Sequence, residues 1–271
     1  MNNFIKRTLS GALFVTLVVG SILLSHVTFI AFFALICGWS MLEFHKLTNM
    51  QADVKVNRFL AVGGAVLLFV CSAFYVSGEI KFPIYSIYGI YIILVLISEL
   101  FVQKTNPIHN WAYFILGQIF IALPFSLLNF IAYVNNYQPI ILLAVFITIW
   151  VNDSGAYLVG ITLGKHRLFE RISPKKSWEG FFGGAIFALL SGYIFSTLIS
   201  EISLVNWLIF SEIIVIFGTL GDLTESLLKR TLNVKDSGNV IPGHGGLLDR
   251  FDSMLLAAPA VYLFLSLLFQ K

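Results

Sequence analysis

Nine stretches of apolar residues, each close to the length that a helix needs to cross a lipid bilayer, dominate this sequence. The chain is 58% hydrophobic and only 11% charged. A soluble domain with so few charged residues would be unusual, since about a quarter is typical. The sequence therefore predicts an all-α integral membrane protein with about nine transmembrane helices. The predicted spans are residues 8–24, 28–48, 58–77, 84–102, 111–133, 139–161, 180–199, 205–229 and 253–269.

The first apolar stretch follows Lys6 and Arg7, as the core of a signal peptide would. No small-residue cleavage site followed by a soluble domain appears, so we expect a retained helix. Cys37 and Cys71 both fall inside apolar stretches without metal-ligand spacing. We interpret them as buried apolar residues rather than as a disulfide or a metal site.

The basic residues predict how the chain is oriented in the membrane. With nine spans, all of the 17 Lys and Arg residues except Lys81 and Lys271 lie on the side of the N-terminus. Basic loops stay in the cytoplasm, so the N-terminus and the loops after the second, fourth, sixth and eighth spans are expected there. Ionisable residues are sparse in the first five spans and frequent in the last four. We therefore expect a scaffold half (1–137) and a catalytic half (138–271) with its site on the cytoplasmic side.

One polar segment, residues 226–252, stands out from this apolar background. Its basic residues can hold phosphates and its aspartates can hold a hard cation. Its glycines allow backbone N–H groups to approach an anion. The basic residues are Lys229, Arg230, Lys235 and Arg250; the aspartates are Asp236, Asp249 and Asp252; the glycines are 238, 243, 245 and 246.

Polar residues also lie on one face of the predicted helix 205–229. Asp222, Glu225, Ser226 and Lys229 follow helical spacing. A functional cluster and a simple Glu225–Lys229 pair within the helix both fit this pattern. Gly218 and Gly221 precede the cluster and would let another helix come close. Glu212, deeper in the same helix, is left without a role.

Three carboxylates, from Asp153, Asp222 and Asp249, can reach the same depth in the membrane. Asp153 lies near the cytoplasmic end of the helix 139–161, and Asp222 and Asp249 flank the last loop. Two carboxylates on one cation are what Mg²⁺ usually takes from a protein. The alternative is a proton relay in a transporter, which would not need the surrounding Lys, Arg and Gly residues.

The loop between the sixth and seventh spans offers an anion site. Ser173-Pro174 is read as the entry to the next helix, with Lys175 and Lys176 beside it and Ser177 as its N-cap. A helix N-terminus favours negative charge, and the two lysines add to this. The alternative is a basic loop that only touches lipid headgroups.

His244 stands between glycines in the sequence Pro-Gly-His-Gly-Gly. Contact with a phosphate or nucleotide, action as a general base and a structural role all remain open for it.

The polar segment 226–252 resembles the signature of the phosphatidate cytidylyltransferase family, also called CDP-diacylglycerol synthases. The matching positions are Ser226, Lys229, Arg230, Lys235, Asp236, Gly238, Pro242, His244, Gly245, Gly246, Asp249, Arg250, Phe251 and Asp252. Two shorter blocks, 173–180 and 221–226, resemble the family as well, and 150–157 and 164–166 are also similar.

The resemblance implies transfer of a cytidylyl group from CTP to phosphatidate by a multi-spanning inner-membrane enzyme. It implies Mg²⁺ on Asp222 and Asp249, with a potassium ion and a homodimer also associated with the fold. No nucleic-acid partner is expected. The implied catalytic residues are Asp222, Lys229, Arg230, Lys235, Asp236, His244, Asp249 and Arg250. The expected substrate-binding residues are Asp153, Lys175, Lys176, Ser177, Ser226, Gly245 and Gly246.

Three other functions fit this sequence less well. A CDP-alcohol phosphotransferase would carry an aspartate-rich helical motif that this sequence lacks. A transporter would be expected to have broken helices at mid-membrane rather than one polar cluster at an edge. A purely structural protein would leave the polar segment without a purpose.

Overall fold

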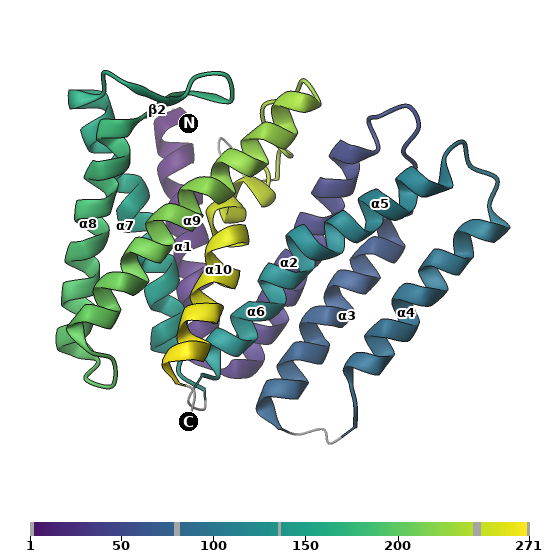
Figure 1. Ribbon diagram of the computed structural model, residues 1–271, viewed down its shortest axis with the longest axis horizontal. Helices are drawn as coiled ribbons and strands as arrows, with labels where there is room; N and C mark the ends of the chain where they lie inside the picture. Colours follow the sequence, from purple (N-terminus) through teal and green to yellow (C-terminus); the bar gives the residue numbers. More distant parts are fainter. Residues whose placement is uncertain (1–2, 79–81, 135–136, 241–244, 270–271) are drawn as a thin grey trace. The chain divides into compact units, whose positions relative to one another are not determined.

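The computed structural model describes residues 3–78, 82–134, 137–240 and 245–269 (Figure 1). The long elements are α-helices, as the sequence predicts. In chain order the elements are α1 (Asn3–Leu24), α2 (His26–Thr48), α3 (Arg58–Ser77), α4 (Tyr85–Ser98), η1 (Glu99–Phe101), α5 (Pro107–Gly117), η2 (Gln118–Ala122), α6 (Leu123–Ala132), α7 (Pro139–Leu163), β1 (Arg167–Phe169), β2 (Ser173–Ser177), α8 (Trp178–Leu198), α9 (Leu204–Thr231) and α10 (Leu248–Leu268).

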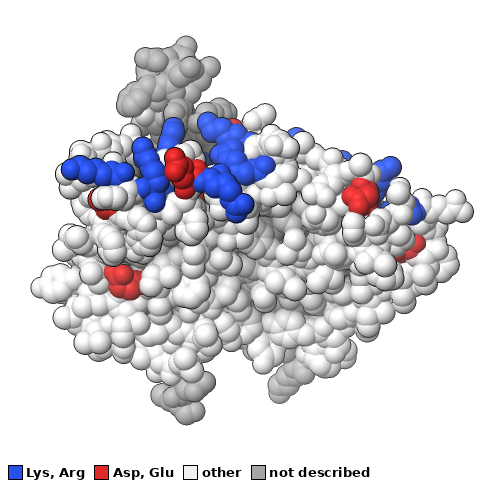
Figure 2. Space-filling model, turned by 45° about the horizontal axis from the view of Figure 1, so that its top comes forward, with Lys and Arg blue, Asp and Glu red and all other residues white. Residues whose placement is uncertain are grey.

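Seven helical stretches in the described ranges are long and apolar enough to cross a membrane, which indicates a multi-pass membrane protein. Two further apolar helices, at Thr8–Leu24 and Tyr85–Phe101, are shorter. Each predicted span thus corresponds to an apolar helix, but length and composition support seven crossings, so the count of nine stays a prediction. Figure 2 shows a face on which most of the surface carries no charged side chain, as lipid contact would require.

Polar side chains define where several helices begin. Ser25 accepts a hydrogen bond from Thr28 N and forms a capping box at the start of α2. Asn57 caps α3 and Asn106 caps α5 in the same way. Each cap satisfies backbone N–H groups that the first turn of a helix leaves unpaired.

The fifth predicted span is a helix with an internal irregularity. Pro107–Ala132 is helical throughout, but η2 is one turn of π-helix just before Pro124. Proline has no N–H and its ring collides with the preceding turn, so a wider turn there relieves the clash. Gln118 at this turn donates to Ala61 O (3.0 Å) and accepts from Tyr88 Oη (3.3 Å).

The chain divides into two compact units. The N-terminal unit contains residues 1–139 and 231–251, and the C-terminal unit contains 140–230 and 252–271. The first division, at 139/140, falls close to the expected one at 137/138. The 231–251 part of the polar segment, however, groups with the N-terminal unit, which the sequence did not suggest.

Aromatic packing explains that grouping. Phe251 lies 5.4 Å from Phe125 and 6.1 Å from Phe33, measured between ring centroids. It also contacts Phe14 at 5.6 Å, and Phe33 in turn packs against Phe29. Phe251 is 1% exposed. Such aromatic contacts supply both buried area and a favourable edge-to-face geometry.

In the C-terminal unit, glycines allow the helices to approach closely. A Cβ on Gly155 of α7 would lie 2.7 Å from the Phe187 ring of α8, and one on Gly183 of α8 would lie 2.5 Å from Val159. A Cβ on Gly221 of α9 would lie 2.5 Å from Asp252 O in α10. The close approach predicted at Gly221 is confirmed, and all three contacts follow the small-residue packing of membrane helices.

Candidate active site

A cavity of about 270 Å³ in the C-terminal unit collects many of the predicted site residues. It is formed by α7, the β1–β2 hairpin, α8 and α9. Its lining includes both carboxylates and lysines beside apolar groups. The lining residues are Asn152, Asp153, Ala156, Tyr157, Gly160, Leu168, Lys175, Lys176, Ser177, Gly180, Phe181, Thr219 and Asp222.

The central polar contact of this cavity joins β2 to α9. Lys176 Nζ lies 2.7 Å from Asp222 Oδ2, and each side chain is a little over a quarter exposed. Ser226 Oγ, one turn further along α9, donates to Asp222 Oδ1 at 3.2 Å. The sequence offered no nearby partner for Asp222, and the structure supplies one from another element. Lys176, Asp222 and Ser226 are therefore brought together by β2 and α9.

The hairpin that carries the lysines was not expected from the sequence. β1 and β2 pair antiparallel, so Ser173–Ser177 is a strand rather than the entry to a helix. The predicted N-cap is confirmed, because Ser177 Oγ accepts from Gly180 N at 3.1 Å and α8 begins at Trp178. The all-α class is supported, since the other elements of the described residues are helical, and the unexpected strand pair places both lysines beside the first turn of α8.

Glu179, in that first turn, ties the hairpin to α8. Its carboxylate accepts from Lys165 N and His166 N, and it lies 2.6 Å from His166 Nδ1. Sequence reasoning assigned Glu179 no role. An acid in the first turn of a helix was the available signal, because it favours the positive end of the helix dipole.

A third carboxylate belongs to the same group of charges. Asp252, near the start of α10, interacts electrostatically with Asp222 and Asp153, and with Lys176 of opposite sign. Within the described ranges, no group of three or more His, Cys, Asp or Glu side chains has a metal-binding arrangement. The donors that are present are carboxylate oxygens, which suit Mg²⁺, a cation that usually takes only one or two carboxylates from a protein.

Two predicted phosphate-binding residues at the end of α9 already have partners. Lys229 forms an ion pair with Glu225, one turn earlier, and both side chains are buried. The pair within the helix that was weighed as an alternative is thus present. Arg230 is exposed and donates from Nε to Ile172 O in the hairpin turn at 3.5 Å.

In the N-terminal unit, the 231–251 loop is organised by Asp249. Its carboxylate accepts from Ser237 N (3.0 Å) and from Gly246 N (2.8 Å). Gly245 has a φ of +83°, and a Cβ there would lie 2.5 Å from Asp249 Oδ2. Glycine is required at this position for both reasons. Of the glycines predicted to admit a phosphate, Gly245 and Gly246 thus lie against the carboxylate of Asp249, and Gly243 lies outside the described residues.

Other predicted residues of the loop point to solvent. Lys235, Asp236 and Arg250 are exposed. His244 lies outside the described residues, so the three roles considered for it stay open.

Glu43 of α2 is a second residue, after Glu179, that sequence reasoning missed. It is 4% exposed and accepts from Ser237 Oγ (3.0 Å) and Leu248 N (2.8 Å). An acid inside an apolar span was the signal that could have found it, because such a residue is costly in hydrocarbon.

Fold and site together define a class: a multi-pass membrane protein with a cavity lined by lysines and carboxylates. A family model described as the cytidylyltransferase family matches residues 5–268. The chain therefore belongs to the cytidylyltransferase family, and the family resemblance of its polar segment is confirmed.

Three similar proteins all carry the name phosphatidate cytidylyltransferase. The protein of Bacillus subtilis is 40% identical over 178 residues, which cover 65% of this chain and 66% of the relative. That of Haemophilus influenzae is 48% identical over 124 residues (44% and 43%), and that of Staphylococcus epidermidis is 44% identical over 126 residues (46% and 48%). The chain thus matches about two thirds of the first relative and less than half of the other two.

Proposed function

We propose that this protein transfers the cytidylyl group of CTP to phosphatidate, forming CDP-diacylglycerol and pyrophosphate. Family membership and the shared name of three relatives support this reaction. The observation that carries it is the cavity in which Lys175, Lys176 and the α8 N-terminus meet Asp222. Both substrates are polyanions, so lysines and a helix N-terminus suit them.

The reaction needs no nucleophile from the protein. A phosphate oxygen of phosphatidate forms a bond to the α-phosphorus of CTP, and the bond from that phosphorus to the bridging oxygen of pyrophosphate breaks. Transfer of this kind depends on positioning and charge stabilisation. We assign charge neutralisation to Lys175 and Lys176 in the cavity, and to Arg230, Lys235 and Arg250.

We propose that Asp222 and Asp249 hold Mg²⁺, which would neutralise phosphate oxygens when bound. The carboxylate oxygens of Asp222 fit a hard cation, and Asp153 and Asp252 add negative charge nearby. Lys176 and Ser226 orient the Asp222 carboxylate. A potassium ion is a further proposal that rests on the resemblance alone.

The membrane arrangement belongs to the same proposal. Nine crossings, with the N-terminus and the cavity on the cytoplasmic side of the inner membrane, would let CTP enter from water and phosphatidate from lipid. The distribution of Lys and Arg along the sequence supports this orientation. A homodimer remains a proposal from the resemblance.

The test is turnover by the purified full-length protein in detergent with phosphatidate and MgCl₂. We expect pyrophosphate release and CDP-diacylglycerol formation with CTP, measured in parallel with dCTP and UTP to define base selectivity. Arg171→Gln serves as a control variant and should turn over like the wild-type protein. Arg171 is an exposed basic residue of the hairpin turn and lies outside the cavity lining. Absence of turnover with every nucleotide would refute the proposal, and substrate-dependent transport in vesicles without turnover would favour a transporter.

A further inference from the structure

Glu43 places a carboxylate from the N-terminal part of the chain against the polar 231–251 loop. It belongs to α2, a helix whose other acidic or basic residues are limited to Lys46 and the histidines at 26 and 45. Its side chain is buried, with 4% of the residue exposed. A buried acid on an apolar helix costs free energy unless it is hydrogen-bonded, so its partners indicate its purpose.

Both recorded partners of Glu43 belong to the 231–251 loop, one at Ser237 and one at the start of α10. Oε2 accepts from Ser237 Oγ at 3.0 Å and from Leu248 N at 2.8 Å. Leu248 is the first residue of α10, where backbone N–H groups have no partner within the helix. Glu43 therefore caps α10 from a different helix. It also links the start of α10, at Leu248, to Ser237.

Asp249 provides a second carboxylate that contacts Ser237, the residue also held by Glu43. Ser237 donates its side-chain hydroxyl to Glu43 and its backbone N–H to Asp249. Gly246 N also donates to Asp249, at 2.8 Å. The two carboxylates thus hold residues 235–240 and 245–250 against each other.

Two glycines, Gly238 and Gly246, lie directly against the Glu43 carboxylate, which leaves no room for a side chain at either position. A Cβ on Gly238 would lie 2.5 Å from Glu43 Oε1, and one on Gly246 would lie 2.4 Å from Glu43 Oε2. Real Cβ atoms do not approach so closely, so the two glycines and Glu43 fit one another. Among the described residues, Oε1 has no hydrogen-bond donor, which leaves Oε2 as the anchoring atom.

We propose that Glu43 is a positioning residue for the proposed cytidylyl transfer. By fixing Ser237 and the start of α10, it sets where Lys235, Asp236 and Arg250 are presented to the anionic substrates. The half of the chain expected to be a scaffold then contributes directly to the geometry of the loop. This inference rests on the proposed function, although the loop contacts themselves do not.

The experiment combines hydrogen exchange with steady-state kinetics on the full-length protein in detergent. In Glu43→Ala, Leu248 N and Ser237 Oγ lose their acceptor, so amides in peptides covering 235–240 and 245–250 should exchange about tenfold faster or more. Turnover should fall by a similar factor or more, mainly in kcat. Glu43→Gln retains a carbonyl oxygen that can accept both bonds and should restore most of the protection and most of kcat.

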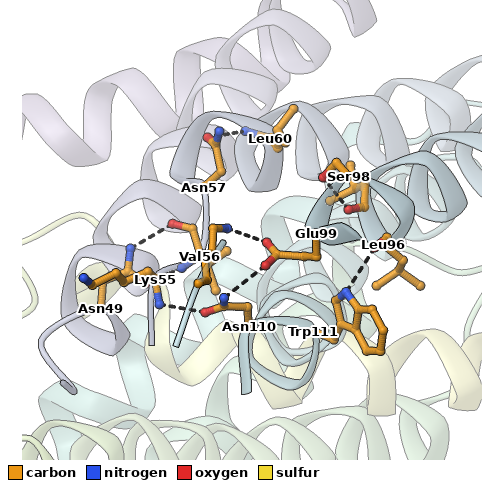
Figure 3. Close-up of polar contacts among 12 residues, drawn as sticks. Asn49, Lys55, Val56, Asn57, Leu60, Leu96, Ser98, Glu99, Asn110 and Trp111 are labelled. Carbon is orange, nitrogen blue, oxygen red and sulfur yellow. Dashed lines mark hydrogen bonds and ion pairs between the residues drawn. The ribbon is translucent and has the colours of Figure 1, made fainter. Parts of the chain in front are cut away.

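Glu99→Ala is the matched control, because it makes the same chemical change as Glu43→Ala in the same unit but away from the loop. Glu99 Oε1 lies 2.5 Å from Lys104 Nζ. Glu99 Oε2 accepts from Asn110 Nδ2 at 3.1 Å (Figure 3). This variant should leave loop exchange and kcat unchanged. If Glu43→Ala does not fold, Ser237→Ala, which removes one of the two donors, provides the same comparison with a smaller effect.

Unchanged exchange of both loop peptides in Glu43→Ala, or in Ser237→Ala if that variant replaces it, would overturn the inference. Faster exchange with normal kcat and KM would overturn it too, because loosening the loop would then have no effect on turnover. Failure of the proposed function gives a different result: the wild-type protein would show no turnover while the exchange difference persisted.

Discussion

The polar groups of the two units are used in contrasting ways. In the C-terminal unit, Lys176 and Asp222 form a partly exposed ion pair on the wall of a cavity. In the N-terminal unit, Glu43 and Asp249 are buried, and their recorded partners are N–H and O–H groups of the loop itself. The Lys176–Asp222 pair faces a cavity, where its charges are accessible to a ligand. The carboxylates of Glu43 and Asp249 instead accept hydrogen bonds that hold the loop in place. These charged residues therefore divide into an ion pair that lines a cavity and two carboxylates that hold the loop.

The largest expected effect comes from comparing the two aspartates predicted to bind Mg²⁺. Asp222→Asn and Asp249→Asn should each reduce turnover by about 100-fold or more, since each removes a negative charge proposed to hold the Mg²⁺ that neutralises the phosphates. Only Asp249→Asn should also speed hydrogen exchange in residues 235–240 and 245–250, because only Asp249 accepts from the loop backbone. Pyrophosphate release and exchange mass spectrometry measure the two effects separately.

Equal loop protection in both variants would contradict the division between the two regions. Asp153→Asn is a useful companion, because Asp153 lines the same cavity as Asp222. Its exchange pattern should follow that of Asp222→Asn.

A smaller effect is expected from adding one carbon to the loop. In Gly246→Ala the new Cβ would lie 2.1 Å from Ser237 Oγ and 2.4 Å from Glu43 Oε2, so these groups must move apart. We expect a loss of about 1–3 kcal/mol in stability, which is typical of overpacking a filled site. Thermal unfolding in detergent measures it. Gly89→Ala in α4 is the control, because a Cβ there has nothing within 4 Å, and it should not lower the unfolding temperature.

The smallest effect should follow from Ser226→Ala. This change removes one hydrogen bond, of 3.2 Å, to Asp222 Oδ1 but leaves the contact with Lys176. A neutral donor contributes about 0.5–1.5 kcal/mol, so kcat/KM should fall by roughly two- to tenfold. A loss as large as that of Asp222→Asn would show that Ser226 has a role of its own, such as direct contact with a substrate.

Much of the cavity could be predicted because its features are local in sequence. The Ser177 N-cap depends on residues three positions apart, and the face of Asp222 and Ser226 follows from helical spacing. The β1–β2 hairpin could not be predicted in this way, because it lacks an apolar alternation that would mark its strands. The partnership of Lys176 with Asp222 depends on that hairpin and was therefore not visible either.

By itself the sequence determined the membrane class and the family, because apolar length and motif residues are read directly along the chain. It also determined which residues of the polar segment carry charge. Only the tertiary structure decided how those charges are used. Ser237 and Leu248 are separated from Glu43 by 194 and 205 residues, so folding alone brings these groups within hydrogen-bonding distance. Burial then makes each such contact matter, since a carboxylate removed from water must find its donors within the protein.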